Sequence, residues 1–152
     1  MQLQWIVTLA VPTLMACASS SEPEGPPLTA TRESAVLVDD VNGPGWPADL
    51  ITLDSAAITD DGRLRLFTRY GGGCADHHAA LLVGRAFAES QPPMLRARVA
   101  HEANNDPCEA LIVRTFEFNL RPVRDHFQQA YNSGTGSVVI DLGGLRVTYV
   151  FQ

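Results

Sequence analysis

Apolar residues recur at every second position over several stretches of this chain, and this alternation constrains its fold more than any other feature. Between residues 63 and 70, Leu64, Leu66, Thr68 and Tyr70 alternate with Arg63, Arg65 and Arg69. A period of two is typical of a strand with one buried face, whereas a helix repeats every 3.6 residues. The same pattern predicts strands over residues 95–101, 110–118, 138–142 and 145–151.

Turn residues separate these stretches. Asp60-Asp61-Gly62 precedes the first strand, and Gly143-Gly144 stands between the last two, as in a two-residue hairpin. Weaker patterns favour strands within residues 36–41 and 50–58, and only residues 123–131 suggest a helix. We therefore predict an all-β fold, an antiparallel β-sandwich or barrel-like domain with one short helix.

The N-terminal region carries an export signal. Residues 5–15 form an apolar stretch that is shorter than the roughly 20 residues needed to span a bilayer, and its length suits a signal peptide. No Lys or Arg precedes it, which departs from the usual signal peptide. Leu14-Met15-Ala16-Cys17 resembles the lipobox of bacterial lipoproteins. An ordinary secretory signal cut after an alanine is the alternative.

The lipoprotein resemblance implies that Cys17 becomes the N-terminal residue. Its sulfur would carry a diacylglycerol, and its amino group would carry an acyl chain such as palmitate. Ala18 replaces the aspartate that retains many lipoproteins in the inner membrane, which favours the outer membrane, facing the periplasm. The segment after Cys17 is rich in Ser, Pro, Glu and Gly. We predict a signal peptide at 1–16, a lipidated cysteine and flexible tether at 17–31, and one β-rich domain at 32–152.

Composition and the absence of two motifs exclude some classes of function. The net charge is −6, which argues against nucleic acid. Neither a phosphate-binding P-loop nor a Gly-x-Ser-x-Gly nucleophile motif occurs in the sequence. The expected partners are the membrane, through the lipid, and an unidentified envelope protein or small ligand.

A cysteine–histidine cluster is the main candidate site. Lipidation of Cys17 leaves Cys74 and Cys108 as a pair, which favours a disulfide in an exported protein. Such a bridge closes a loop of 34 residues and contributes roughly 3–4 kcal/mol.

Strand register predicts how the cluster assembles. A turn over Asn104-Asn105 would set His101 opposite Cys108, while a turn near Ser90-Gln91 brings the strand after His78 back beside the same strand. Cys74 would then lie two strands from Cys108 and reach it only from a glycine-rich loop that arches over the strand end.

Metal binding is the alternative use of this cluster. Cys74, His77, His101 and Cys108 offer two sulfurs and two nitrogens, a set that suits zinc. A variant keeps the disulfide and binds a metal through His77, His78 and His101 with Asp76 or Asp106. Otherwise no cofactor is expected.

Three segments resemble a group of uncharacterised bacterial exported proteins with a GGGCxxH … HxxxxxxCEA signature. They are Tyr70-Gly71-Gly72-Gly73-Cys74-x-x-His77, His101-x₆-Cys108-Glu109-Ala110 and Phe116-x-Phe118-Asn119-Leu120-x-Pro122. Glu102 and Asn119 replace aspartates of that group, which weakens an oxygen-ligand role. The resemblance implies no established activity. We predict a membrane-anchored lipoprotein with a binding or structural role, against the alternative of a metal-dependent or redox enzyme using Cys74, His77, His101 and Cys108.

Overall fold

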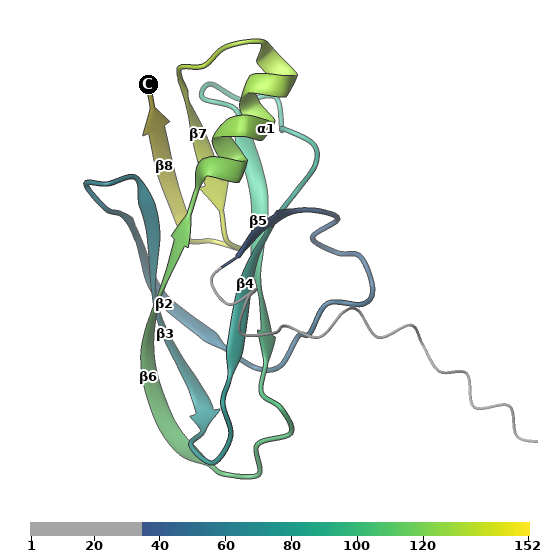
Figure 1. Cartoon of the computed structure of the whole chain (residues 1–152), viewed down its shortest axis with the longest axis vertical. Helices are drawn as coiled ribbons and strands as arrows, with labels where there is room; N and C mark the ends of the chain where they lie inside the picture. The colour runs from purple at the N-terminus through teal and green to yellow at the C-terminus, as the bar shows by residue number, and fades with distance from the viewer. Residues whose placement is uncertain (1–34) are drawn as a thin grey trace, which may run out of the picture.

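A computed structural model describes residues 35–152, which form two β-sheets and a short helix (Figure 1). The first four strands are β1 (Val36–Val38), β2 (Thr52–Ile58), β3 (Arg63–Gly72) and β4 (His78–Val83). They are followed by β5 (Met94–Glu102), β6 (Ala110–Asn119), the helix α1 (Arg121–Tyr131), β7 (Gly136–Asp141) and β8 (Arg146–Phe151).

The strands divide between a five-stranded sheet, in the order β1-β4-β5-β7-β8, and a three-stranded sheet, in the order β2-β3-β6. The expected all-β fold with one short helix is confirmed, and within residues 35–152 neither sheet closes into a barrel. Most neighbouring strands are antiparallel, but β1 runs parallel to β4 and β5 runs parallel to β7. The short pairing of β5 with β7 joins the last hairpin to the larger sheet.

The two predicted turns have the expected chemistry. Gly62, which ends the turn between β2 and β3, has φ +76°. Gly143 and Gly144 between β7 and β8 have φ +76° and +125°, and Leu142 donates to the carbonyl of Leu145 across them. Only glycine adopts such angles readily, so these residues fix where each hairpin reverses.

The core lies between the two sheets. The inward positions of β3 and β6 meet those of β4, β5, β7 and β8, which gives one continuous apolar cluster. Its fully buried members include Leu64, Leu66, Leu81, Leu95, Phe118 and Ile140. The period-two pattern of the sequence is therefore the pattern of burial, because alternate side chains of a strand point to opposite faces.

Helix α1 carries the chain from the smaller sheet to the larger one. Pro122 stands in its first turn, where a missing N–H costs nothing, and Asn132 ends it in the left-handed conformation with φ +53°. Its buried residues are Val123 and Phe127, and Phe127 packs edge-on against Phe151 of β8. The helix thus covers one end of the core (Figure 1).

One predicted pairing is wrong. The strand containing His101 does not form a hairpin with the strand that follows Cys108, because β5 pairs with β4 and β7 whereas β6 pairs with β3. Residues 103–109 instead cross from the larger sheet to the smaller one. The apolar alternation assigns each strand a buried face, and a strand in the facing sheet satisfies that pattern equally well. The predicted pairing of β4 with β5 is correct.

The predicted signal peptide, the lipidated Cys17 and the tether at 17–31 lie outside the described residues. Within residues 35–152, no helix has the length and hydropathy needed to cross a bilayer.

Candidate functional site

Two loops that exchange the chain between the sheets meet at one end of the molecule. Residues 73–77 lead from β3 to β4, and residues 103–109 lead from β5 to β6; we call them the crossing loops. Both lie at the lower end of Figure 1. All the cysteines and histidines of the predicted cluster belong to these loops or to the strand ends beside them.

A disulfide between Cys74 and Cys108 joins the crossing loops, with the two Cα atoms 5.7 Å apart. Gly72 and Ala110 form the last pair of the β3–β6 register, so each cysteine of the bridge lies two residues beyond that pair, one on the β3 side and one on the β6 side. The sequence had placed Cys74 two strands away from Cys108. That difficulty does not arise, because β6 is the direct neighbour of β3 and the disulfide extends their ladder.

Asp106 holds the same loops together through its carboxylate. Its Oδ2 accepts the backbone N–H groups of Gly73, Cys74 and Ala75 at 2.8, 2.9 and 2.9 Å, and its Oδ1 accepts that of Cys108 at 2.9 Å. These hydrogen bonds, those of Cys108 and Ala75 above all, hold the pKa of the carboxyl far below its usual range. Asp106 is therefore ionised, with its acceptor positions filled by the opposite loop.

Glycine makes this arrangement possible. Three successive N–H groups can point at one oxygen only where the backbone curls around it. Gly73 has φ +119°, an angle that residues with a side chain rarely adopt. The glycine run therefore shapes an anion-binding turn that the carboxylate of Asp106 fills from within the same chain.

A line of buried hydrogen bonds runs from Asp106 into the core. Nε2 of His77 lies 3.1 Å from Oδ2 of Asp106, and Nδ1 of His77 lies 3.1 Å from Nε2 of His101. Nδ1 of His101 in turn lies 3.2 Å from the backbone oxygen of Asp49. Only 3% of His77 and 1% of His101 is exposed, so water does not compete for these contacts. The line therefore connects the two crossing loops to the segment before β2.

The tautomer of each ring decides which atoms donate along this line. The oxygens of Asp49 and of ionised Asp106 only accept, and two neutral imidazoles carry two N–H hydrogens between them, one fewer than the three contacts. Which of these contacts are hydrogen bonds therefore depends on the tautomers of His77 and His101.

The surroundings of the two rings are largely apolar. Burial lowers the pKa of His101, against the opposing hydrogen bond to the Asp49 carbonyl, and the neighbouring His77 lowers it further. The ring of Tyr70 stacks on His77 at 4.6 Å between centroids. His101 is therefore held in its neutral form.

The remaining predicted ligands lie elsewhere. His78 pairs in register with Glu102, whereas His101 pairs with Ala79, so His78 and His101 point to opposite faces of the larger sheet. Asp76 is exposed, and its backbone oxygen accepts a hydrogen bond from Asn104. The structure thus brings together His77, His101 and Asp106 but not His78 or Asp76.

The donor atoms offer little to a metal in this state. Among residues 35–152, the group of three potential ligands that converges within 4.8 Å is Cys74, Asp106 and Cys108. Both sulfurs of that group are bonded to each other, and the carboxylate is filled by N–H groups. As it stands, the arrangement joins the two crossing loops through the disulfide and the carboxylate of Asp106.

Sequence reasoning missed three participants. The backbone oxygen of Asp49 cannot be recognised from the sequence, because every residue has one. Tyr70 was read only as the end of an alternating strand, although its ring contacts both histidines. Gly72 was read as loop flexibility. A pairing of β3 with β6 that runs on to residue 72 was the signal that could have placed it at the site.

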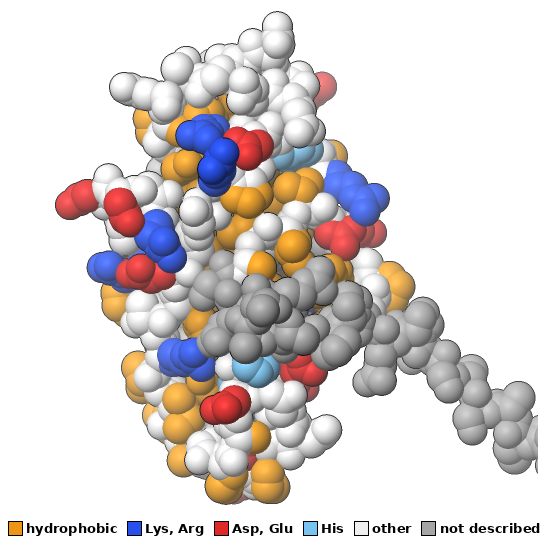
Figure 2. All heavy atoms as spheres, viewed as in Figure 1, with side chains coloured by type: hydrophobic (Ala, Val, Ile, Leu, Met, Phe, Trp, Pro, Cys, Tyr) orange, Lys and Arg blue, Asp and Glu red, His pale blue; other side chains and the backbone are white. Residues whose placement is uncertain are grey.

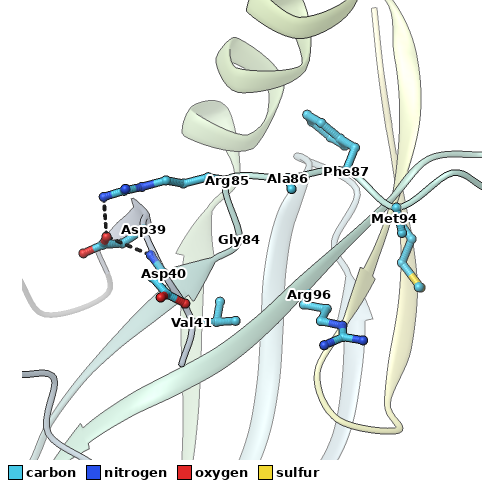
Figure 3. A pocket seen from close by; sticks show the side chains of 10 residues that line it. Asp39, Asp40, Val41, Gly84, Arg85, Ala86, Phe87, Met94 and Arg96 are labelled. Carbon is cyan, nitrogen blue, oxygen red and sulfur yellow. Dashed lines mark hydrogen bonds and ion pairs between the residues drawn. The ribbon is translucent and has the colours of Figure 1, made fainter. Parts of the chain in front are cut away.

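A separate cleft lies on the outer face of the larger sheet (Figure 3). It has a volume of about 520 Å³, and its walls are residues 39–41, residues 84–88 and the start of β5. Figure 3 shows Arg85 reaching across to Asp39, an ion pair of 2.7 Å. Val41 and Arg96 also line a neighbouring cleft of about 390 Å³, so the two hollows adjoin. Of the predicted site residues that lie within 35–152, none lines either cleft.

Known proteins resemble this chain only weakly. No protein-family model and no curated protein sequence matches it. Among solved structures, a protein described as a lipoprotein from Bacteroides fragilis has a TM-score of 0.49 at 9% identity, over 78% of this chain and 69% of that one. A NigD-like immunity protein from Bacteroides caccae has a TM-score of 0.49 at 13% identity, over 75% and 57%.

A protein of unknown function from Bacteroides vulgatus has a TM-score of 0.44 at 12% identity, over 78% of this chain and 55% of that chain. This chain thus spans a little over half the length of the latter two structures. Identity this low carries no information on activity.

Proposed function

We propose that this chain is a lipid-anchored protein of the bacterial cell envelope, whose disulfide-linked β domain has a binding or structural role rather than a catalytic one. Cys17 would hold the lipid in the outer membrane, and the domain would face the periplasm. The partner would be an envelope protein or a small ligand.

The observation that carries this proposal is the disulfide between Cys74 and Cys108. With Cys17 assigned to lipid, the chain has two cysteines left, and both take part in this bond. Stable disulfides belong to oxidising compartments, which supports export. The position of the bond supports a structural role, because it locks the two crossing loops where the chain changes sheets.

The competing function is a metal-dependent or redox enzyme that uses Cys74, His77, His101 and Cys108. The geometry weighs against zinc in this set, since the sulfurs are bonded to each other and Nε2 of His77 faces Asp106. The geometry also weighs against a redox site in which a histidine activates a cysteine. The ring nitrogens of His77 and His101 contact each other, Asp106 and Asp49 rather than a sulfur.

Fractionation of cells that produce the full chain tests the anchor. The wild-type protein should be found in the membrane fraction, and a Cys17→Ser variant should leave it, because the lipid has no other attachment site. A Cys108→Ser variant serves as the matched control and should remain in the membrane fraction. Equal membrane retention of wild type and Cys17→Ser would contradict the anchor.

Thiol titration of the purified native protein tests the site. We expect no reactive thiol before reduction and two after it. Two reactive thiols in the unreduced protein, together with one zinc per chain by elemental analysis, would favour the metal alternative instead.

A further inference from the structure

Strand β6 has an open edge that is apolar on one side. Within residues 35–152 it pairs with β3 alone, over ten residues from Ala110 to Asn119. Leu111 and Val113 point away from the core beside that edge and are 69% and 73% exposed. Hydrophobic side chains gather on the flank of the molecule where β6 runs (Figure 2). The edge therefore combines unpaired backbone groups with exposed apolar side chains.

The other edges of the two sheets are protected in ways that β6 is not. Strand β1 has only three residues, β2 carries an irregularity between Leu53 and Ser55, and β8 packs beside β2. The pairing of β6 with β3 has no such irregularity along its whole length. Long regular edges readily pair with a further strand, and proteins usually blunt them by shortening, bulging or charge.

Charges on the surrounding outer face are already matched. Arg65 pairs with Glu117 at 2.7 Å, and Arg69 pairs with Asp54 at 2.6 Å. A partner therefore does not need to bring an opposite charge to this face. A surface whose charges are paired within one chain can meet an identical surface, as a symmetric contact requires.

We propose that β6 is the docking edge for β6 of a second copy of this chain. The two strands pair in antiparallel orientation about a two-fold axis at Ile112, which places Leu111 of each copy opposite Val113 of the other. The two three-stranded sheets then become one sheet of six strands. This contact buries the exposed apolar pair and pairs the backbone of residues 110–114 of the two copies.

Charge disfavours three other registers. An axis at Leu111 sets the apolar Val113 of each copy opposite the charged Glu109 of the other. An axis at Val113 sets Glu109 of each copy opposite Glu117 of the other, and an axis at Arg114 sets that arginine opposite itself. Like charges directly opposite each other destabilise a strand pair. The axis at Ile112 places no like charges opposite each other and pairs leucine with valine twice.

Cysteine cross-linking of the full chain tests the register. Residues directly opposite each other have Cβ atoms about 4.5–5.5 Å apart, so a Leu111→Cys/Val113→Cys double variant should form dimers under mild oxidation on a non-reducing gel. Each single variant should cross-link several-fold less, because its two cysteines are diagonal. A Val150→Cys variant, on β8 and nearly as exposed at 64%, is the control and should remain monomeric. Absence of dimers from the double variant, or equal dimers from Val150→Cys, would overturn the proposal.

Sedimentation equilibrium of the purified full chain, in density-matched detergent, gives an independent measure. The wild type should associate to dimers, and Val113→Lys should weaken that association at least tenfold. Its unfolding midpoint should equal that of the wild type at protein concentrations where both are monomeric. Val150→Lys should associate as the wild type does. A monomeric wild type at all concentrations, or dimers that are insensitive to Val113→Lys, would overturn the proposal whether or not Cys17 carries lipid.

Discussion

Gly72 provides the space in which His77 meets Asp106. A Cβ atom at this position would lie 2.6 Å from Nε2 of His77 and 3.0 Å from Oδ2 of Asp106. These are the two atoms whose contact links the buried histidines to the crossing loops. At the residue scale, the absence of a side chain at position 72 is therefore a condition for the hydrogen-bond line.

Replacement of Gly72 by alanine should separate His77 from Asp106. We expect a loss of about 1–3 kcal/mol in the free energy of unfolding, the usual cost of forcing a methyl group into a packed site. Urea denaturation at pH 7 measures it.

Gly71→Ala is the matched control. A Cβ atom at Gly71 meets nothing within 4 Å, and alanine restricts the unfolded chain more than glycine does. This variant should be as stable as the wild type or slightly more so. Equal losses in the two variants would show that the contact at Gly72 has no special importance.

The stability of the domain should fall on mild acidification. Burial lowers the pKa of His101 from its ordinary value of 6.5, so below that pH the unfolded chain binds a proton that the native state excludes. The contribution of His101 to the free energy of unfolding is thus fully present above pH 6.5. It is lost as the pH falls from 6.5 through the lowered pKa of the native state. The slope from this one group is at most about 1.4 kcal/mol per pH unit.

Urea denaturation of the wild type and of a His101→Gln variant at pH 7, 6 and 5 measures this dependence. The variant should lose less stability than the wild type between pH 7 and 5, since it lacks the group that titrates. Parallel slopes would contradict the role assigned to His101. The carboxyl of Asp106 acts in the same direction at still lower pH, because its pKa is also lowered in the native state.

At the scale of elements, the disulfide extends the β3–β6 ladder at the point where both strands leave their sheet. Replacing Cys74 and Cys108 together by serine should lower the free energy of unfolding by roughly 3–4 kcal/mol, because the unfolded chain is then free of a closed loop. The same variant should keep its β-sheet circular dichroism at 25 °C. A double variant with the unfolding midpoint of the wild type would show that the bridge does not stabilise the domain.

Most strands were predictable because each has one buried face. Leu64 and Leu66 in β3, or Val138 and Ile140 in β7, alternate with exposed or half-buried neighbours, and the structure places strands at these positions. Their pairing was not predictable to the same degree. The segment after His101 crosses to the facing sheet, and a period of two carries no information on which sheet a strand joins.

The candidate site shows the same division. The pairing of Cys74 with Cys108 could be predicted from the cysteine count and the compartment, and the approach of His77 or His78 to His101 followed from the β4–β5 register, although the register did not decide between the two. The role of Asp106 could not, because it depends on four backbone N–H groups whose directions are set by the loop conformation.

At the scale of the whole molecule, the disulfide, the Asp106 contacts and the histidine line all lie at the end where the crossing loops join the two sheets. The open edge of β6 begins at the same end, with Ala110 following directly on the bridged loop. Locking these loops therefore also fixes the start of the strand that we propose as a docking edge. A strand end fixed in this way agrees with the proposed binding or structural role.

Mass spectrometry of the native full-length product is the most direct test of the central claim, that this is an anchored envelope protein with an oxidised domain. The account predicts a chain that begins at Cys17, carries the added mass of a diacylglycerol and an acyl group, and gains two hydrogens on reduction. A chain that retains Met1, carries no lipid mass and contains free Cys74 and Cys108 would contradict it.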